Sequence, residues 1–250
     1  MILYGRAFAR GRGFTFNMLP AKTIAIIPAR GGSKRIPRKN IKPFNGRPII
    51  AYSIEAAIKS GCFGQVVVST DDAEIADVAR SAGASVPFLR SAENSNDFAG
   101  LADVCREVLE QFKALGSEFE LLCCILPTAP FVSAPRLQQG LDLLIKSNAE
   151  ALIPVTNFSY PAQRAIKIDE SGQLSMIWPE YYNSRSQDLP TSYHDAGQFY
   201  WIFSKALMEQ MRFFAKNSSA LILPQMEVQD IDSLEDWQLA EIKYNMCRSE

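Results

Sequence analysis

The segment from Arg30 to Lys39 carries five cations and no acid. These cations are Arg30, Lys34, Arg35, Arg38 and Lys39. Gly31 and Gly32 permit backbone conformations that other residues avoid and let N–H groups approach a ligand, while Ser33 adds a hydroxyl donor. We call residues 30–39 the basic loop. Its composition predicts a binding site for the phosphates of a nucleotide.

Two other interpretations of the basic loop are a solvated surface loop and a nucleic-acid patch. The loop directly follows an apolar segment, Thr23–Ala29, that reads as a buried strand, and this position favours a ligand site. Neither the GxxxxGKS/T spacing of a Walker loop nor a GxGxxG turn is present. Aromatic residues that could stack on bases are not interleaved with the cations, so we expect no nucleic-acid partner.

Near the other end of the chain, Asp230 and Asp232 flank Ile231. Carboxylates two residues apart on an extended segment project to the same side. Mg²⁺ prefers oxygen ligands and commonly bridges one or two carboxylates to phosphate, so the pair is a candidate magnesium site. The alternative is helix capping, in which Asp232 or Ser233 caps the helix that follows. Both interpretations remain open at this stage.

Alternating strands and helices must position these groups. The segments Thr23–Ala29, Gln65–Thr70, Leu121–Leu126 and Ala151–Val155 are predicted to be strands. Pro48–Ser60, followed by Gly61, has the termini of a helix, and an apolar stripe from Leu101 to Phe112 predicts another. This order predicts an α/β fold with a mostly parallel central sheet flanked by helices, whose ligands lie at the carboxyl ends of the strands.

Two segments depart from this alternation. Residues 1–22 lack periodicity and a signal-peptide core, so we expect a flexible N-terminal extension, and Met18 is an alternative start. Residues 23–250 form the expected catalytic domain. Within it, residues 157–200 are rich in Tyr, Ser, Pro and Gln, which predicts a small inserted lobe or a dimer-forming arm.

Composition excludes several classes of protein. The chain has 250 residues and a net charge of −1, yet residues 1–54 hold eleven of the 26 cations and no acid. No apolar run reaches 18 residues, so no membrane span is expected. With one histidine, His194, a multi-histidine metal site is excluded, and five cysteines without CxxC spacing predict a cytoplasmic protein without disulfides.

Several ordered motifs resemble the CMP-nonulosonate synthetases, also called acylneuraminate cytidylyltransferases. The matching segments read IIPARGGSKRIPRKNI, PIIAYSI, VVVSTDD, LPTAP and VQDIDSLEDW and extend over nearly all of the chain after Lys22. The resemblance implies a Rossmann-like fold of the nucleotide-sugar transferase type. It also implies a homodimeric enzyme that uses CTP and Mg²⁺ to make a CMP-sugar and pyrophosphate.

Carried onto this sequence, the resemblance assigns Arg30, Ser33, Lys39 and Asn40 to the CTP loop. It also assigns a nucleotide-binding role to Arg90, for which the alternative is an exposed arginine after an edge strand. Asp230 and Asp232 match the family's metal-binding carboxylates. Arg30 and Lys39 would neutralise charge on the phosphates, so catalysis depends on positioning and electrostatics and needs no protein nucleophile.

The stretch from Tyr181 to Tyr200 contains candidates for recognising an acidic sugar, because a guanidinium can pair with a carboxylate while amides and hydroxyls select substituents. These candidates are Arg185, Gln187, Tyr193 and His194, of which Arg185 matches an active-site arginine of the family. A surface loop is the alternative interpretation, and it is harder to dismiss for His194 than for Arg185.

The identity of the sugar depends on departures from the neuraminate pattern. LPTAP stands where those enzymes commonly have QPTSP, and Ala196-Gly197 replaces Asn-Gly. The segments FSYPAQRAIKID and SRSQDLPTSYHDAGQFYW look instead like the branch that activates pseudaminic acid for bacterial flagellin or surface glycans. The competing hypotheses are activation of neuraminate, legionaminate or another acidic sugar, and a nucleotide-binding module without catalysis.

Overall fold

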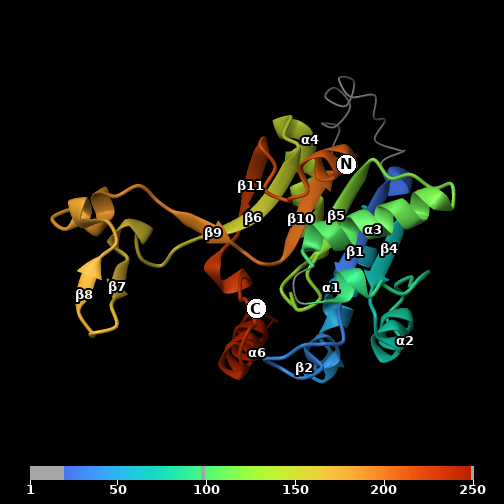
Figure 1. The fold of residues 1–250 in the computed structure, drawn as a ribbon, viewed down its shortest axis with the longest axis horizontal. Coiled ribbons are helices and arrows are strands. Elements are labelled where there is room, and N and C mark those ends of the chain that lie inside the picture. Colours follow the sequence, from blue (N-terminus) through green and yellow to red (C-terminus); the bar gives the residue numbers. More distant parts are fainter. Residues whose placement is uncertain (1–19, 97–98, 249–250) are drawn as a thin grey trace.

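The computed structural model describes residues 20–96 and 99–248, built around a seven-stranded sheet (Figure 1). The strand order is β11-β6-β10-β5-β1-β4, and β9 pairs with β6. The strands are β1 (Thr23–Pro28), β4 (Gln65–Ser69), β5 (Leu121–Ile125), β6 (Ala151–Asn157), β9 (Tyr193–Asp195), β10 (Phe199–Phe203) and β11 (Ser218–Ile222). The four predicted strands are therefore confirmed as β1, β4, β5 and β6.

The sheet is mixed but mostly parallel. Strand β1 runs parallel to β4 and β5, and β11 runs parallel to β6. Strand β10 lies antiparallel between β5 and β6, and β9 is antiparallel to β6. Five of the seven strands thus point in one direction, which confirms the predicted α/β class. The carboxyl ends of β1, β4 and β5 meet at one edge of the sheet.

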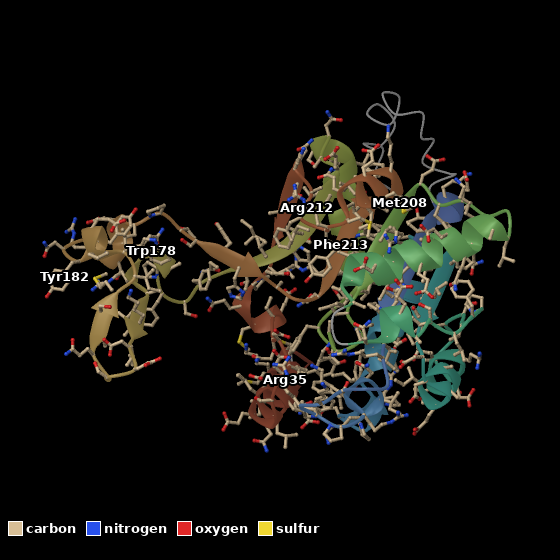
Figure 2. All side chains as sticks on the ribbon, in the orientation of Figure 1. Arg35, Trp178, Tyr182, Met208, Arg212 and Phe213 are labelled. Carbon is tan, nitrogen blue, oxygen red and sulfur yellow. The ribbon has the colours of Figure 1, made fainter. Side chains whose placement is uncertain are left out.

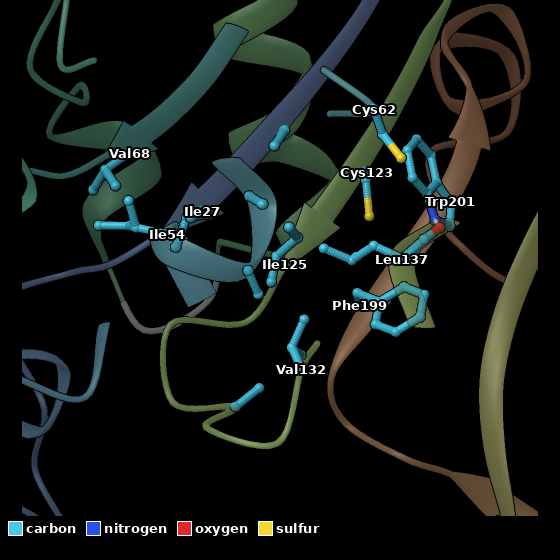
Figure 3. Packing of buried hydrophobic residues seen from close by; sticks show 14 of the residues in the cluster. Ile27, Ile54, Cys62, Val68, Cys123, Ile125, Val132, Leu137, Phe199 and Trp201 are labelled. Atoms are coloured by element: carbon cyan, nitrogen blue, oxygen red, sulfur yellow. Dashed lines mark hydrogen bonds between the residues drawn. The ribbon is translucent and has the colours of Figure 1, made fainter. Parts of the chain in front are cut away.

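Helices cover both faces of the sheet. They are α1 (Ile50–Ser60), α2 (Ala73–Ser81), α3 (Leu101–Ala114), α4 (Ala134–Ser147), α5 (Ser204–Gln210) and α6 (Leu234–Arg248). Alternate residues of β1 face opposite cores: Ala25 and Ile27 pack with α1, α2 and α4, whereas Ile24 and Ile26 pack with α3 and α5. Figure 3 shows the first of these cores, in which Trp201 lies between Cys62 and Leu137.

Local sequence signals explain the helix ends. The predicted helix Pro48–Ser60 is confirmed from Ile50 onward, and Gly61 ends it with a left-handed φ of 63°. Pro48 itself belongs to a short hairpin made of β2 (Pro43–Phe44) and β3 (Arg47–Pro48). The Asp72 side chain caps α2 by accepting a hydrogen bond from the Ile75 N–H.

A third apolar cluster fixes α6 against the segment that follows β1. Ile36 and Ile231 are almost fully buried in it. Phe44 makes edge-on ring contacts with Trp237 and Tyr244, at centroid distances of 5.7 and 5.4 Å. Figure 1 shows α6 beside β2 accordingly. This cluster brings residues from both ends of the described chain to the same edge of the sheet.

An extended arm leaves the sheet after β6 and returns at β9 (Figure 1). It comprises residues 158–192 and includes the hairpin of β7 (Ile166–Ile168) and β8 (Leu174–Met176), with short 3-10 helices at Ala162–Arg164, Pro179–Tyr181 and Ser186–Asp188. The predicted insertion extended to residue 200, but residues 193–195 and 199–203 form sheet strands β9 and β10. We call residues 158–192 the arm.

The N-terminal prediction falls mostly outside the described residues. Residues 1–19, including Met18, are among those not described, and Pro20–Lys22 forms a single 3-10 turn before β1. Within residues 20–96 and 99–248, no helix is both long and apolar enough to span a membrane.

Candidate active site

The basic loop folds back on itself at the carboxyl end of β1. The Asn40 side chain is buried, and its Nδ2 donates to the Arg30 carbonyl oxygen at 2.8 Å. The Ser33 N–H donates to the Gly31 carbonyl at 3.0 Å, and the Lys39 N–H donates to the Ile36 carbonyl at 3.2 Å. The first bond holds the start and the end of the loop together, and the other two form local turns within it.

A cavity of about 440 Å³ opens beside this loop, at the edge where β1 and β5 end. Its polar lining consists of Arg30, Ser33, Lys34, Arg35, Lys39, Asn40, Arg90, Asn94, Asn96 and Thr128. We call it the cationic cavity, because five of these side chains are cations and none of the described residues that line it is a carboxylate. Two of the lining residues contact each other, because Arg30 Nη1 donates to the Asn96 carbonyl at 3.3 Å. Such a lining suits a polyanion.

Arg90 is buried rather than exposed, so the alternative interpretation of this residue is wrong. Only 8% of Arg90 is exposed, its Nε donates to Ser69 Oγ at 3.0 Å, and its Nη2 donates to the Ser69 carbonyl. Burial lowers the pKa of its guanidinium. Arg90 therefore contributes positive charge to the cationic cavity from a fixed position at the end of β4.

The two glycines do not line the cationic cavity. The Gly31 N–H donates to Asp71 Oδ1 at 2.9 Å, towards the end of β4 and not towards the cavity. A side chain at Gly31 would also collide with Asp72, because its Cβ would lie 2.7 Å from Asp72 Oδ2. The absence of a side chain at Gly31 therefore allows a close approach of the loop to these aspartates.

The acidic pair meets the basic loop directly. Arg35 Nη2 lies 2.8 Å from Asp232 Oδ1, and Lys39 Nζ lies 3.6 Å from the same oxygen. Lys39 Nζ also donates to the carbonyl of Ile231. Residues predicted from opposite ends of the sequence are thus neighbours in space.

Helix capping at α6 uses Ser233 and leaves Asp232 free for other contacts. The Asp236 N–H donates to Ser233 Oγ at 3.2 Å, while Asp236 Oδ2 accepts from the N–H groups of Ser233 and Asp232 at 2.8 and 3.1 Å. This reciprocal arrangement is a capping box. Of the two interpretations of Asp232, the structure excludes side-chain capping.

A second cavity, of about 510 Å³, lies on the other side of the acidic pair. Its lining consists of Thr156, Asn157, Ser159, His194, Asp195, Ala196, Gln225, Val228, Gln229, Asp230, Asp232, Asp236 and Lys243. We call it the polar cavity. Thr156 is 2% exposed, and its Oγ1 has no hydrogen-bond partner among the described residues. A buried hydroxyl of this kind is costly unless a ligand or water satisfies it.

The acidic pair fits a divalent cation in its chemistry. Within residues 20–96 and 99–248, no cluster of three or more His, Cys, Asp or Glu side chains forms a complete cage. Desolvation raises the pKa of Asp230, and the nearby charge of Asp232 raises it further. A bound cation would therefore stabilise the ionised form of Asp230, and Mg²⁺ commonly completes so small a set of carboxylates with waters and phosphate.

Comparison with known proteins agrees with this geometry. A family profile described as cytidylyltransferase matches residues 24–175. The pseudaminic acid cytidylyltransferase of Campylobacter jejuni subsp. jejuni serotype O:2 is 44% identical over 225 residues, covering 90% of this chain and 97% of the relative. The chain belongs to the cytidylyltransferase family. The resemblance inferred from the motifs is therefore confirmed.

More distant relatives share the fold of this cytidylyltransferase. The CMP-N,N'-diacetyllegionaminic acid synthase of Legionella pneumophila is 33% identical and covers 88% of this chain and 95% of its own length. A structure of CMP:2-keto-3-deoxy-manno-octonic acid synthetase complexed with CTP has a TM-score of 0.65 at 16% identity, covering 92% of this chain and all of its own. At that identity the likeness shows a common fold.

Two of the residues predicted to bind the sugar lie away from both cavities of the cytidylyltransferase. Arg185 and Gln187 are on the arm, where Arg185 Nε pairs with Asp188 Oδ2 at 2.6 Å. Figure 2 shows Trp178 and Tyr182, also on the arm, far from Arg35 of the basic loop. Within one chain the structure does not bring Arg185 or Gln187 to the acidic pair.

His194 lines the polar cavity, and Tyr193 lies next to it on β9 with 45% exposure. The His194 ring lies against Phe158, and its Nδ1 is 2.8 Å from the Asp195 carbonyl oxygen. The adjacent Asp195 accepts a hydrogen bond from the Tyr200 hydroxyl at 2.7 Å. Burial of Tyr200 raises the pKa of this hydroxyl, and the charge of Asp195 raises it further. Asp195 is therefore held in place at the wall of the polar cavity.

Several cavity residues were missed by sequence reasoning. Thr156 sits in β6, whereas Gln225 and Gln229 flank the turn before α6, and Lys243 belongs to α6 itself. Lys243 Nζ donates to the Val228 carbonyl and to Gln229 Oε1, both at 3.0 Å. The unsatisfied hydroxyl of Thr156 and these amide contacts depend on the folded packing, so no local sequence pattern could have revealed them.

Proposed function

We propose that this cytidylyltransferase transfers CMP from CTP to pseudaminic acid, a nine-carbon acidic sugar, and releases pyrophosphate. The observation that carries the proposal is the contact between the cationic basic loop and the acidic pair at Asp232. This contact puts the proposed phosphate site next to the proposed cation site, at the boundary between the two cavities. The relatives named as pseudaminic acid cytidylyltransferases support the choice of sugar.

In the reaction the anomeric hydroxyl of the sugar loses its proton and its oxygen forms a bond with the α-phosphorus, while the bond from that phosphorus to the bridging oxygen breaks and pyrophosphate leaves. Negative charge increases on the phosphate oxygens during this step. Arg30 and Lys39 line the cationic cavity and would stabilise that charge, and Ser33 and Asn40 line the same wall. Arg90 adds a fixed positive charge from its buried position.

Asp230 and Asp232 would hold the divalent cation, for which we propose Mg²⁺, and the bound cation would neutralise phosphate charge. Lys39 lies between these groups, since its Nζ contacts the Ile231 carbonyl while its side chain lines the cationic cavity. We infer that Lys39 links the phosphate position to the cation position. No protein nucleophile is needed, because the sugar supplies the attacking oxygen.

The polar cavity is the proposed sugar site. It adjoins the cationic cavity through Asp232 and offers an unsatisfied hydroxyl from Thr156 together with the amides of Gln225 and Gln229. Lys243 and His194 are the two side chains of its lining that can carry positive charge, and a sugar carboxylate needs such partners. The mixture of acceptors and donors suits a sugar with amide and hydroxyl substituents.

We further propose that the enzyme is a homodimer whose arm reaches the partner's site. The arm exposes large apolar side chains in a short stretch of chain, and such patches mark interaction surfaces. They include Tyr160 at 81%, Ile168 at 68%, Leu174 at 62% and Tyr182 at 73% exposure. Arg185 and Gln187 would then act on the sugar bound to the second subunit.

All five cysteines are free, and four of them are buried, which supports the proposal that the enzyme works in the reducing cytoplasm. Its product would supply glycans of flagellin or of the bacterial surface.

The deciding experiment is an assay of pyrophosphate release with CTP, Mg²⁺ and a panel of sugar acids. The panel contains pseudaminic, legionaminic, neuraminic and deoxy-manno-octulosonic acids, and we expect the highest kcat/KM with pseudaminic acid. A higher value with another acid would replace the proposed substrate. Tight CTP binding without pyrophosphate release from any acid would instead identify a nucleotide-binding module.

A further inference from the structure

Two consecutive aspartates after β4 contact the basic loop on the side away from the cationic cavity. Asp71 Oδ1 accepts from the Gly31 N–H at 2.9 Å. Asp72 accepts a bidentate pair of hydrogen bonds from Arg38, with Nη1 at 2.5 Å from Oδ2 and Nη2 at 3.0 Å from Oδ1. Glu74 accepts a further bond from the same guanidinium. The two aspartates therefore hold both ends of the loop.

Arg38 has a backbone conformation that is unfavourable for a residue with a side chain. Its φ of 54° and ψ of 29° are left-handed, and no side-chain bond caps the 3-10 turn that begins after it. This turn contains Lys39 and Asn40, both of which line the cationic cavity. The direction of these two side chains consequently depends on the unusual conformation at Arg38.

Asp72 can control that conformation because it is itself fixed. Its Oδ1 accepts from the Ile75 N–H at 3.0 Å as the cap of α2, and its own N–H donates to Thr70 Oγ1 at 3.2 Å. The Arg38 guanidinium holds the pKa of Asp72 down at about 2, so the carboxylate stays charged near neutral pH. Asp72 does not line the cationic cavity, and its hydrogen bonds to the basic loop are those with Arg38.

We propose that Asp72 is a positioning residue for the nucleotide phosphates: its paired contact with Arg38 keeps the left-handed turn that directs Lys39 and Asn40 into the cationic cavity. This inference rests on the proposed function, since it takes the cavity to be the CTP site. It assigns to the end of β4 a role in nucleotide affinity that is separate from the role of Asp72 as a helix cap.

The variant Asp72→Ser separates these two roles, because serine also caps helices but cannot pair with both guanidinium nitrogens. We expect the KM for CTP to rise about tenfold, the effect of losing a charge-assisted hydrogen bond. The KM for the sugar acid should stay within about twofold, since the polar cavity does not include this contact. Asp77→Ser is the matched control, because Asp77 is an exposed residue of α2 paired only with Arg80 among the ion pairs of the described chain.

A second pair of variants tests the backbone at Arg38. Both Arg38→Ala and Arg38→Gly remove the guanidinium, but glycine adopts the left-handed conformation without steric cost. We expect the glycine variant to have a KM for CTP several-fold below that of the alanine variant. We also expect Arg38→Gly to lower the raised KM of Asp72→Ser when the two changes are combined. A role of Arg38 limited to its charge would make the glycine and alanine variants equal.

The outcomes separate this inference from the proposed function. If Asp72→Ser keeps the wild-type KM for CTP, or raises the KM of both substrates equally, the positioning role is refuted even though the enzyme is active. If the wild-type protein releases pyrophosphate with no sugar acid, the proposed function fails. Calorimetric titration with CTP then still tests Asp72, because the positioning role requires weaker CTP binding by Asp72→Ser than by Asp77→Ser.

Discussion

Arg35 Nη2 lies 2.8 Å from Asp232 Oδ1, so the loop after the first strand and the segment before α6 meet in one ion pair. Both side chains are substantially exposed, at 70% and 41%, and an exposed pair of this kind contributes little to stability. The importance of the contact is therefore positional. It places positive charge beside Asp232, and it marks the boundary between the two cavities.

The acidic pair predicts a cation effect that is measurable without catalysis. In Asp230→Asn, the loss of a carboxylate whose pKa is raised should increase the Tm without added metal at neutral pH, because ionisation of that group disfavours the folded state. Added Mg²⁺ should raise the Tm of the wild type but not of this variant. We expect turnover to fall by about 10²-fold or more.

Asp142→Asn is the control for this measurement, because Asp142 is an exposed residue of α4 outside both cavities. It should respond to Mg²⁺ as the wild type does. An equal Mg²⁺ response of Asp230→Asn and the wild type would show that the cation binds elsewhere.

Removing the Arg30 side chain should lower kcat/KM by about 10²–10³, the usual effect of deleting one donor to a transition-state oxyanion. Arg30 lines the cationic cavity, whereas Arg212 is exposed and lies outside it. Steady-state kinetics of Arg30→Ala and Arg212→Ala therefore make a matched comparison, with the latter expected near the wild-type value. Near-wild-type turnover by Arg30→Ala would refute its catalytic role.

The free energy of unfolding should decrease at acidic pH because Asp72 becomes protonated. An acid whose pKa falls on folding stabilises the native state above its unfolded pKa, and this contribution disappears as the pH falls towards the folded value. For Asp72 that range extends from about 4 down to about 2, and the difference is on the order of 2 kcal/mol at most. Urea unfolding between pH 6 and pH 3 should show a smaller loss for Asp72→Ser than for the wild type. Parallel curves would contradict the expected ion-pair contribution.

The packing of Ile231 in the third apolar cluster, which also contains Ile36, should support the acidic pair. Ile231 is fully buried between the two aspartates, so Ile231→Ala should destabilise the protein by about 2–5 kcal/mol. We also expect a higher Mg²⁺ requirement in the assay, because the carboxylates lose their support. Leu239→Ala, at an exposed position of α6, should change stability by less than about 0.5 kcal/mol.

A shared site between subunits predicts complementation. Arg30→Ala and Arg185→Ala are each expected to be nearly inactive. If Arg185 acts in the partner's site, refolding an equal mixture of the two variants should restore about one quarter of wild-type activity, because half of the dimers have one intact site of two. No recovery in mixtures shown to contain heterodimers would place Arg185 outside the partner's site.

The sequence predicts the strands and the fold class of this protein better than the side-chain contacts of its site. Alternating apolar segments identified β1, β4, β5 and β6, because burial on both faces requires continuous apolar strands. The ordered motifs correctly indicated the family. The antiparallel insertion of β10 between β5 and β6 could not be predicted, since strand order depends on pairings between distant segments.

Side-chain directions show the same limit within the site. Glycines of the basic loop suggested free N–H groups for phosphate, but the Gly31 N–H binds Asp71, some 40 residues later in the chain. Arg90 has an ordinary surface-like sequence context, yet it is buried through two contacts with Ser69. Both outcomes depend on how β4 lies against β1, which no short motif encodes.

The contacts between the basic loop and the segment before α6 join residues that are synthesised at very different times. Lys39 leaves the ribosome 192 residues before Ile231, the residue whose carbonyl it binds. A nascent chain can therefore expose the basic loop well before Asp230 and Asp232, the proposed cation ligands, have been synthesised. Such a chain is expected to bind nucleotide phosphates without catalysing transfer, because the catalytic site is complete only when the C-terminal segment has folded.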